Sequence, residues 1–346
     1  MRKLVLLVIL TMVLSVPVSA MDFTAPSAPE DVQELMPADT ETFSQGLWKI
    51  VKEALAKFAP DLTAAAGLCL ALSAVVILAS LLNGMPGNSK KVVHFVSVLA
   101  VSAILFEQAN TMVNLCAETV HAISDYGKML LPVMTSALAA QGGTSGASAL
   151  YAGTMLFDTL LTTLISSLLV PMVYIYLALA IAQSATGEEL LKKLRDFIKW
   201  LLTWCLKVSL YVFTGYLSIT GVITGTADAA TLKATKLTIS GVVPVIGGIL
   251  SDASETVILG AGVLKSSVGI YGLLAILAIC ITPFLHIAVQ YLLLKLTAAL
   301  CGVFGVKPAS DLIDDFAGAM GLLLGMTGVV SLLMLISIVC FMKGMG

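Results

Sequence analysis

The chain is poor in charged and aromatic residues for its length. Of its 346 residues, only 12% are charged and 7% are aromatic, whereas 58% are hydrophobic. A soluble globular domain carries about twice that share of charged residues. The mean hydropathy of +1.01 therefore excludes a soluble domain and predicts a membrane protein with several spans. The net charge of -2 and the lack of a basic, aromatic-rich stretch argue against nucleic acid as a partner.

The sequence also lacks the motifs of common catalytic and cofactor sites. It has no glycine-rich phosphate loop, no His-Glu-x-x-His, no Gly-x-Ser-x-Gly and no EF-hand spacing. Its six cysteines form no Cys-x-x-Cys pair and lie mostly in apolar runs, which indicates small buried residues rather than disulfides or metal ligands. One weak metal site stays open, formed by His121 with Glu118 and Asp125, although a hydrated polar face explains the same spacing. We therefore expect no enzyme and no cofactor, with any ATP hydrolysis supplied by another subunit.

The N-terminal region predicts three segments before the membrane domain. Residues 1–20 combine two basic residues, an apolar core and small residues at the end, which is typical of a signal peptide, with an uncleaved anchor as the alternative. Residues 21–46 contain six acidic residues and no lysine or arginine, which predicts a flexible acidic tail outside the cytoplasm. Residues 47–60 place apolar side chains at helical spacing among lysines and predict an amphipathic helix at the membrane interface.

The membrane domain, residues 62–341, begins with an uncharged span at Leu62–Leu82 and then shows an internal repeat. The period is 112, so that Pro132 returns as Pro244 and Pro171 as Pro283. The copies cover residues 92–200 and 201–316, and a final span follows at 317–340. Each copy contains, in this order, one predicted span, a polar stretch, a broken helix pair, a long apolar run with a central proline, and an amphipathic turn. The two copies are expected to be parallel.

The broken helix pair is clearest at residues 239–266. Two short apolar runs there flank a polar hexapeptide, in which Asp252 and Glu255 have the spacing of a helix N-cap and its reciprocal partner. Neither run reaches the roughly 20 residues of a spanning helix. We therefore expect a re-entrant pair, and a fainter copy of it around Pro132 after a span that ends near Val113.

These features predict an all-α polytopic integral membrane protein with about six spanning helices and two broken or re-entrant pairs. The long runs at 151–183 and 267–304 each suit either one kinked helix or a two-span hairpin. Single helices place Lys192 and Lys193 in the cytoplasm, as positive charge favours. Six spans place the C-terminus outside the cytoplasm. If only the second run is divided into two spans at Pro283, the chain has seven spans and its C-terminus lies in the cytoplasm.

Charged residues in or beside the spans are the candidates for contacts or for lining a path, because charge in lipid is costly. The amphipathic turns of the two copies are residues 188–194 and 310–316. Lys192 and Lys193 occupy the positions in the first turn that Asp314 and Asp315 occupy in the second. The two turns therefore either form ion pairs with each other or are solvated separately. Glu107 lies within a span beside polar neighbours. The full set of candidates is Glu107, Lys192, Lys193, Asp252, Glu255, Asp314 and Asp315.

The segment KLTISGVVPVIGGILSDASETVILGAGVLKSSVGIYG and the later QYLLLKLTAAL resemble the stage III sporulation protein AE family of endospore-forming Firmicutes. The resemblance implies a protein of the mother-cell membrane around the forespore. It also implies a place in the stage III sporulation A complex, a channel or secretion-like apparatus with a separate ATPase subunit that joins stage II sporulation protein Q. The family brings no established catalytic or binding residues.

A second function remains open from the residues alone. Paired repeats and discontinuous helices are also expected of a self-sufficient secondary transporter. The expected parallel repeats and the lack of a cluster of buried acids for coupling ions favour the channel component.

Overall fold

The structure is a computed structural model that describes residues 25–36, 43–83, 90–140, 144–219, 267–303 and 306–344. Within these ranges the secondary structure is helical, with short turns between helices. The predicted signal peptide at 1–20 and the re-entrant pair at 239–266, which includes Asp252 and Glu255, lie outside the described residues.

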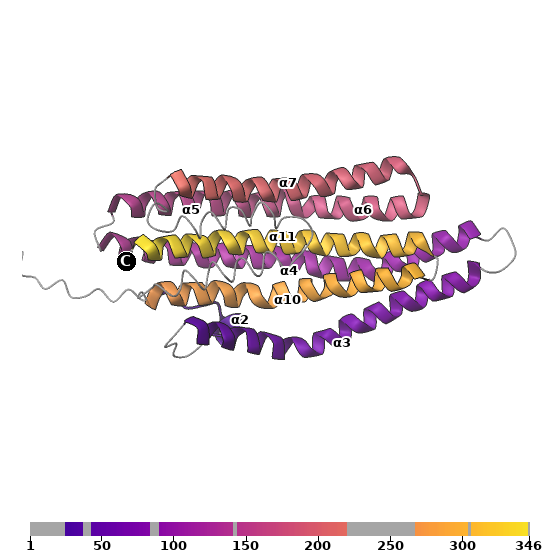
Figure 1. Ribbon diagram of the computed structural model, residues 1–346, viewed down its shortest axis with the longest axis horizontal. Coiled ribbons are helices and arrows are strands. Elements are labelled where there is room, and N and C mark those ends of the chain that lie inside the picture. Colours follow the sequence, from indigo (N-terminus) through magenta and orange to yellow (C-terminus); the bar gives the residue numbers. More distant parts are fainter. Residues whose placement is uncertain are drawn as a thin grey trace, which may run out of the picture.

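The described helices form an elongated bundle whose long helices run side by side (Figure 1). Helices α4, α7 and α11 run in one direction, and α3, α5 to α6, and α10 run in the other (Figure 1). Their bounds are α2 Glu30–Gln33, α3 Phe43–Asn83, α4 Lys90–Ala140, α5 Thr144–Leu164, α6 Val170–Thr186, α7 Glu189–Ile219, α10 Ser267–Val303 and α11 Lys307–Gly344.

Six of these helical segments are long and apolar enough to cross a membrane, which confirms the predicted number within the described residues. The first has the predicted bounds, Leu62–Leu82. The two long runs with a central proline are each one continuous helical segment, Ala147–Thr186 and Val268–Val303, as predicted. The side of the membrane on which each end lies remains a prediction.

Helix α4 corrects the prediction for the first repeat copy. It continues for 51 residues, through Val113 and Pro132, and ends only at Ala140. Such a helix is about 75 Å long, more than twice the thickness of the hydrocarbon core. The predicted polar break between the two helices is present, because α4 ends at Ala140 and α5 begins at Thr144. The helices on both sides of the break are long, however. The predicted short re-entrant pair around Pro132 is therefore wrong.

The reason is that the polar stretch of α4 keeps the helical period of its apolar residues. Cys116, Val120 and Ile123 follow one another at spacings of about one turn and are fully buried. These side chains hold the stretch against the bundle, so the helix does not end where its mean hydropathy falls.

The N-terminal residues also differ from the prediction. Residues 47–60 are the first part of α3 rather than a separate interfacial helix, and Ile50 and Ala54 within them are fully buried. Helix α3 bends (Figure 1), and Phe58 in this part of it packs edge-on against His286 of α10 at a ring distance of 5.1 Å. Burial against the bundle therefore stabilises a segment whose pattern alone suggested a membrane surface.

Residues 25–36 are docked on the bundle rather than free. The Tyr126 hydroxyl donates a hydrogen bond to the Pro26 carbonyl (3.2 Å), and the Ala28 amide donates to the Tyr271 hydroxyl (3.4 Å). Leu35 is buried as well. Lys57 of α3 lies 2.6 Å from a Glu34 carboxylate oxygen, and this contact lowers the pKa of Glu34.

A π-helical turn, Ile165–Leu169, joins α5 to α6. Pro171 follows it closely and has no backbone N–H with which to bond the carbonyl one turn earlier. The wider turn accommodates the unpaired backbone without ending the helix. At the other end of α6, Gly187 adopts a left-handed conformation (φ 75°) and donates to the Gln183 carbonyl at 2.7 Å, which ends the helix before α7 begins.

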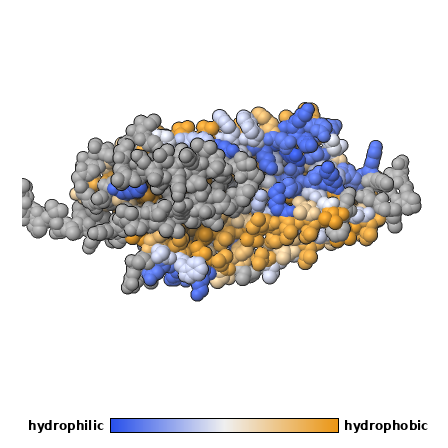
Figure 2. All heavy atoms as spheres, in the orientation of Figure 1, coloured by the Kyte–Doolittle hydropathy of each residue, from blue (hydrophilic) through white to orange (hydrophobic). Residues whose placement is uncertain are grey.

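Helix α11 lies at the centre of the bundle and contacts α4, α5, α6, α7 and α10. In its most apolar stretch, 78% of the residues are buried inside the protein, against 17% in that of α3. Figure 2 shows the complementary surface: hydrophobic residues cover the side formed by α3 and α10, and hydrophilic residues gather where α6 meets α7.

Candidate functional site

Two groups of polar residues stand out in this apolar bundle. One joins the ends of α6, α7, α10 and α11, and the other runs along the exposed side of α4. The first group, which we call the end cluster, consists of Tyr176, Gln183, Arg195, Lys295, Asp314 and Asp315.

An ion pair between Arg195 of α7 and Asp315 of α11 is the centre of the end cluster. Each of the two side chains is only 12% exposed. Arg195 also donates to the Gln183 side-chain oxygen (3.0 Å), and the Tyr176 hydroxyl donates to the Asp315 backbone carbonyl (3.2 Å). The pair therefore ties α6 and α7 to α11 with most of its hydrogen-bonding groups satisfied.

Lys295 of α10 completes the end cluster by an ion pair of 2.6 Å with Asp314. The cluster borders an open hollow of about 440 Å³, which Lys192 and Asp311 also line. Its acidic and basic side chains largely neutralise each other. The arrangement is suited to holding four helix ends together rather than to concentrating one charge on a substrate.

The end cluster contains the predicted contact between the two turns, but the basic residue that makes it differs from the predicted ones. The structure brings the turn with Asp314 and Asp315 beside the basic turn, but the residue that pairs is Arg195. Lys192 and Lys193 are exposed and make no ion pair within the described residues. Sequence pattern matched the turns position by position, whereas the contact depends on which side of α7 faces α11.

The second group is a row of polar residues on α4, which we call the α4 polar face. Successive members are three or four residues apart, so they share one side of the helix. All of them are exposed. The members are Glu107, Asn110, Asn114, Glu118, His121, Asp125 and Lys128.

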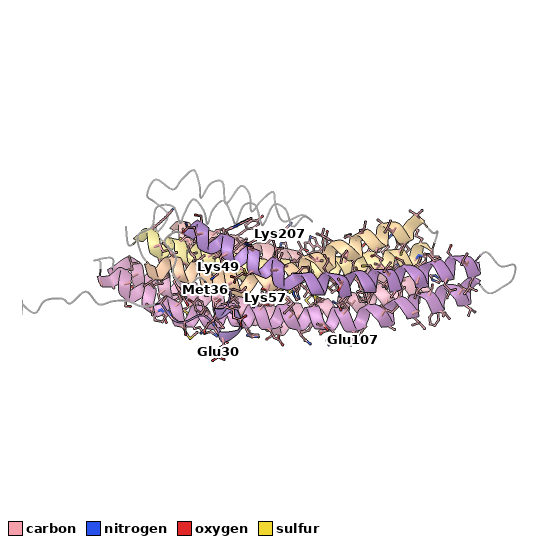
Figure 3. The ribbon with its side chains drawn as sticks, turned by 90° about the horizontal axis from the view of Figure 1, so that it is seen from below. Glu30, Met36, Lys49, Lys57, Glu107 and Lys207 are labelled. Atoms are coloured by element: carbon pink, nitrogen blue, oxygen red, sulfur yellow. The ribbon has the colours of Figure 1, made fainter. Side chains whose placement is uncertain are left out.

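Glu107 begins this row and points away from the bundle (Figure 3). The predicted polar contact of Glu107 with another span is not made within the described residues. Three carboxylates and one lysine in the row would each cost about 3 kcal/mol in the middle of a hydrocarbon layer. Contact of this face with lipid is therefore strongly unfavourable.

The row contacts α6 and the π-helical turn along one edge. The Tyr174 hydroxyl donates to the Asn110 side-chain oxygen at 2.6 Å, and Ser166 lies 3.0 Å from His121 Nε2. Lys128 pairs with Asp125 at 2.8 Å on the surface of α4. The part of the chain that the structure describes contains no group of three or more metal-binding side chains close together.

One carboxylate lies inside the bundle behind this row. Asp158 of α5 is 1% exposed, and it accepts a hydrogen bond of 2.6 Å from the Ser124 hydroxyl of α4. Its other oxygen, Oδ1, has no hydrogen-bond partner in the described part of the chain. Asp158 was not among the candidates predicted from the sequence, because position in a span does not show how deeply a side chain lies in the protein.

Comparisons with known proteins decide the family. The model of the family described as stage III sporulation protein AE matches residues 31–344, from α2 to the end of α11. The chain belongs to the stage III sporulation protein AE family. It is thus a sporulation-related membrane protein, in agreement with the resemblance seen in its sequence.

A curated relative with the same description, stage III sporulation protein AE of Bacillus subtilis (strain 168), is 23% identical over 264 residues. The match covers 76% of this chain and 66% of the relative. The chain therefore spans about two thirds of the length of that relative. No solved structure is similar to this protein.

Proposed function

We propose that this protein is a non-enzymatic membrane component of a channel or secretion-like complex that links the mother cell and the forespore. The observation that carries the proposal is the family match across residues 31–344, which takes in every long helix of the bundle. A match of this extent concerns the whole membrane domain. The proposed place is the mother-cell membrane that surrounds the forespore.

The distribution of basic residues supports an orientation for the bundle. The last residues of α3, α6 and α10 and the first residues of α4, α7 and α11 lie at one end of the bundle (Figure 1). Lys91, Lys192, Lys193 and Lys199 lie in the first turns of α4 and α7 or close to them. Because cytoplasmic loops are enriched in lysine and arginine, this end is the cytoplasmic one in our proposal, and the end cluster lies there.

The proposed partners are the other stage III sporulation A proteins, including a separate ATPase subunit, and indirectly stage II sporulation protein Q. In this proposal the end cluster holds the helix ends together on the cytoplasmic side, where the ATPase subunit would act. The chain would then supply the membrane part and no catalysis.

Replacement of the resident protein of this family in a sporulating Bacillus subtilis strain tests the proposal. The tagged chain should restore heat-resistant spores and co-purify with the other stage III sporulation A proteins from cells that have completed engulfment. A tagged, unrelated protein of the same membrane serves as the control. Spore formation without any co-purification would contradict membership in a complex.

Reconstitution of the purified chain alone separates this role from the alternative of a self-sufficient transporter. In proteoliposomes, the chain alone should move no solute that protein-free vesicles do not also pass. Saturable uptake by the chain alone would favour the transporter and overturn the proposed role.

A further inference from the structure

Helix α7 carries aromatic and basic side chains on the side that faces away from the bundle. Phe197, Trp200 and Trp204 are each about half exposed, and their rings stack at centroid distances of 5.9 Å and 6.2 Å. Lys193 precedes the aromatic residues and Lys207 follows them. Successive members of this set are three or four residues apart, so all five share one side of the helix. We call them the α7 aromatic stripe.

The α7 aromatic stripe has the composition of a protein interface. Tryptophan is enriched in protein contacts, and contiguous exposed apolar surface marks a site of interaction. Within the described ranges, neither Lys193 nor Lys207 forms an ion pair. The stripe therefore presents an aromatic centre with a positive charge at each end.

The α4 polar face presents the opposite charges on another side of the bundle. In the part of the chain that the structure describes, the side chains of Glu107 and Glu118 form no hydrogen bond or ion pair. Asn114 lies between them on the same side of α4. In Figure 3, Glu107 lies at one edge of the bundle and Lys207 lies toward the opposite edge. Contact between these two surfaces would therefore join two different chains.

The heights of the two surfaces along the bundle can be compared, because α4 and α7 both pack on α11 and run in the same direction (Figure 1). In α4, the Cys116 thiol contacts the Leu323 carbonyl at 3.6 Å, and a Cβ on Gly127 would meet the Met334 side chain. Both contacts join residues 207 positions apart, so the register between α4 and α11 is constant.

One end of the α4 polar face matches one end of the α7 aromatic stripe. In the constant register, Glu118 of α4 is level with Gly325 of α11. Leu206 of α7 meets the same glycine, since its Cδ1 lies 3.4 Å from the position where a Cβ would stand. Lys207 is the next residue, so Glu118 and Lys207 differ in height by about 1.5 Å, the rise of one residue.

The other ends of the two surfaces match as well. Glu107 is level with Asp314 of α11, and the adjacent Asp315 pairs with Arg195 of α7. Lys193 lies two residues before Arg195, a rise of about 3 Å that the long lysine side chain spans. The register is internal to the chain, so the match holds at any depth of the bundle in the membrane.

A second copy of the chain satisfies both surfaces at once. Copies arranged around an axis along the bundle share one height, so each glutamate can lie level with a lysine of the next copy. The tryptophans between the lysines then face Asn114 between the glutamates, whose oxygen can accept from an indole N–H. Lipid on the stripe would leave Glu107 and Glu118 unpaired. Contact of α4 with α4 would bring like charges together.

We propose that copies of this chain assemble head to tail, with the α7 aromatic stripe of one copy docked on the α4 polar face of the next. The contact joins two different surfaces, so it is heterologous, and its repetition generates a ring or an open row instead of a two-fold dimer. The inference goes beyond the proposed function, because it concerns the assembly of this chain with itself and needs no other sporulation protein.

Cysteine cross-linking tests the contact in non-sporulating cells that produce two full-length copies with different tags. Both copies carry alanine at the partly exposed Cys69, Cys205 and Cys280. One copy carries Glu118→Cys and the other Lys207→Cys, and the membranes are treated with a short bifunctional methanethiosulfonate.

We expect a product that contains both tags, at about ten times the yield of the control pair or more, because docking raises the effective concentration of the two thiols. The control pair is Leu55→Cys with Lys207→Cys, since Leu55 is 52% exposed on α3 and belongs to neither surface. Two copies with Glu118→Cys, or two with Lys207→Cys, should link no better than the control pair.

Charge reversal gives an independent readout at the other end of the contact, where Glu107→Cys and Lys193→Cys form the cross-linked pair. Glu118→Lys in the first copy should lower this yield about tenfold, because two lysines then lie level with each other. Lys207→Glu in the second copy should restore the yield to within about twofold, as expected of two residues in contact. Monodisperse elution of each variant in detergent shows that it is folded.

Four results would overturn the proposal. The first is a yield for Glu118→Cys with Lys207→Cys no higher than for the control pair in folded variants. The second is a link between two cysteines of one chain when both are placed in the same copy. The third is a link between two copies with the same cysteine as strong as the mixed link, which would show a two-fold contact. The fourth is labelling of Trp200→Cys by a probe carried in lipid, without any cross-link between copies, which would assign the stripe to lipid.

Discussion

Helices α3 and α11 have the same mean hydropathy, 2.5 in each apolar segment, yet they occupy opposite positions in the bundle. The apolar stretch of α11 is 78% buried inside the protein and that of α3 is 17% buried. Hydropathy measures the free-energy cost of exposing a helix to water. Contact with lipid and burial in the protein avoid this cost equally well. Position in the bundle is decided instead by which residues meet the neighbouring helices, including glycines at points of close approach.

Small residues of the packed helices illustrate this difference. Gly318 of α11 has the Tyr176 hydroxyl 2.8 Å from the position where a Cβ would stand, and the Lys199 ammonium is close behind. Gly67 of α3 has nothing within 4 Å of the same position. The glycine in α11 is required for a close approach, and the glycine in α3 is not.

The largest expected effect concerns charge at the packed centre. Asp315→Asn removes the buried one of the two carboxylates that pair with Arg195, which is 12% exposed, and leaves only Asp196, which is 56% exposed, so we expect stability to fall by about 3 kcal/mol. The matched control is Asp125→Asn, whose carboxylate is 67% exposed and pairs with Lys128. That change should cost less than about 1 kcal/mol. Thermal unfolding in detergent compares them, and equal losses would contradict the difference between centre and surface.

Leucine truncation tests the comparison directly. Leu323→Ala in α11 removes a side chain with no exposed surface and should cost about 2–4 kcal/mol, because a cavity remains. Leu70→Ala in α3 removes one that is 72% exposed and should change stability by less than about 0.5 kcal/mol. Denaturation of both purified variants in one detergent measures the difference. A loss for Leu70→Ala as large as that for Leu323→Ala would show that α3 is covered.

The effect of a glycine-to-alanine substitution on stability should change sign between the centre and the edge of the bundle. A Cβ on Gly272 of α10 would lie 2.6 Å from Cδ2 and 3.4 Å from Cγ of the buried Leu130 of α4, so Gly272→Ala should cost about 1–3 kcal/mol because that branched side chain is held by the core. Gly67→Ala in α3 meets no atom and should stabilise the helix by up to about 1 kcal/mol. Melting temperatures that fall for both variants would refute the assignment of free space around Gly67.

The smallest effect is expected for the outer pair of the end cluster. Lys295 and Asp314 are 38% and 49% exposed, so Lys295→Met should cost less than about 1 kcal/mol. The same unfolding assay applies, and Lys192→Met is the control, because Lys192 makes no ion pair in the described part of the chain. A loss above 2 kcal/mol would place Lys295 at the centre of the cluster instead of its edge.

Sequence alone was sufficient for the class, the number of spans and the proline-bearing helices. Leu62–Leu82 has its predicted bounds because an uncharged run between polar ends leaves little choice. The extent of α4 was not predicted, since mean hydropathy falls along its polar half while buried residues such as Val120 and Ile123 keep the helical period.

The candidate site was predicted only in part. Asp314 and Asp315 do meet the basic turn, yet Arg195 was not singled out, because pairing depends on the rotation of α7 about its axis. Lys295 was not among the predicted candidates, and it pairs with Asp314. Asp252 and Glu255 remain predictions, since they lie outside the described residues.

The claim that α11 crosses the membrane once, at the centre of a bundle of six spans, can be tested at its two exposed ends. Asp311→Cys and Lys343→Cys are produced in non-sporulating cells, where the chain lies in the outer cell membrane, and are labelled with an impermeant maleimide in intact cells and then in opened membranes to report the side of each end. We expect Lys343→Cys to react in intact cells and Asp311→Cys only after opening. Reaction of both positions from the same side would contradict the six-span bundle.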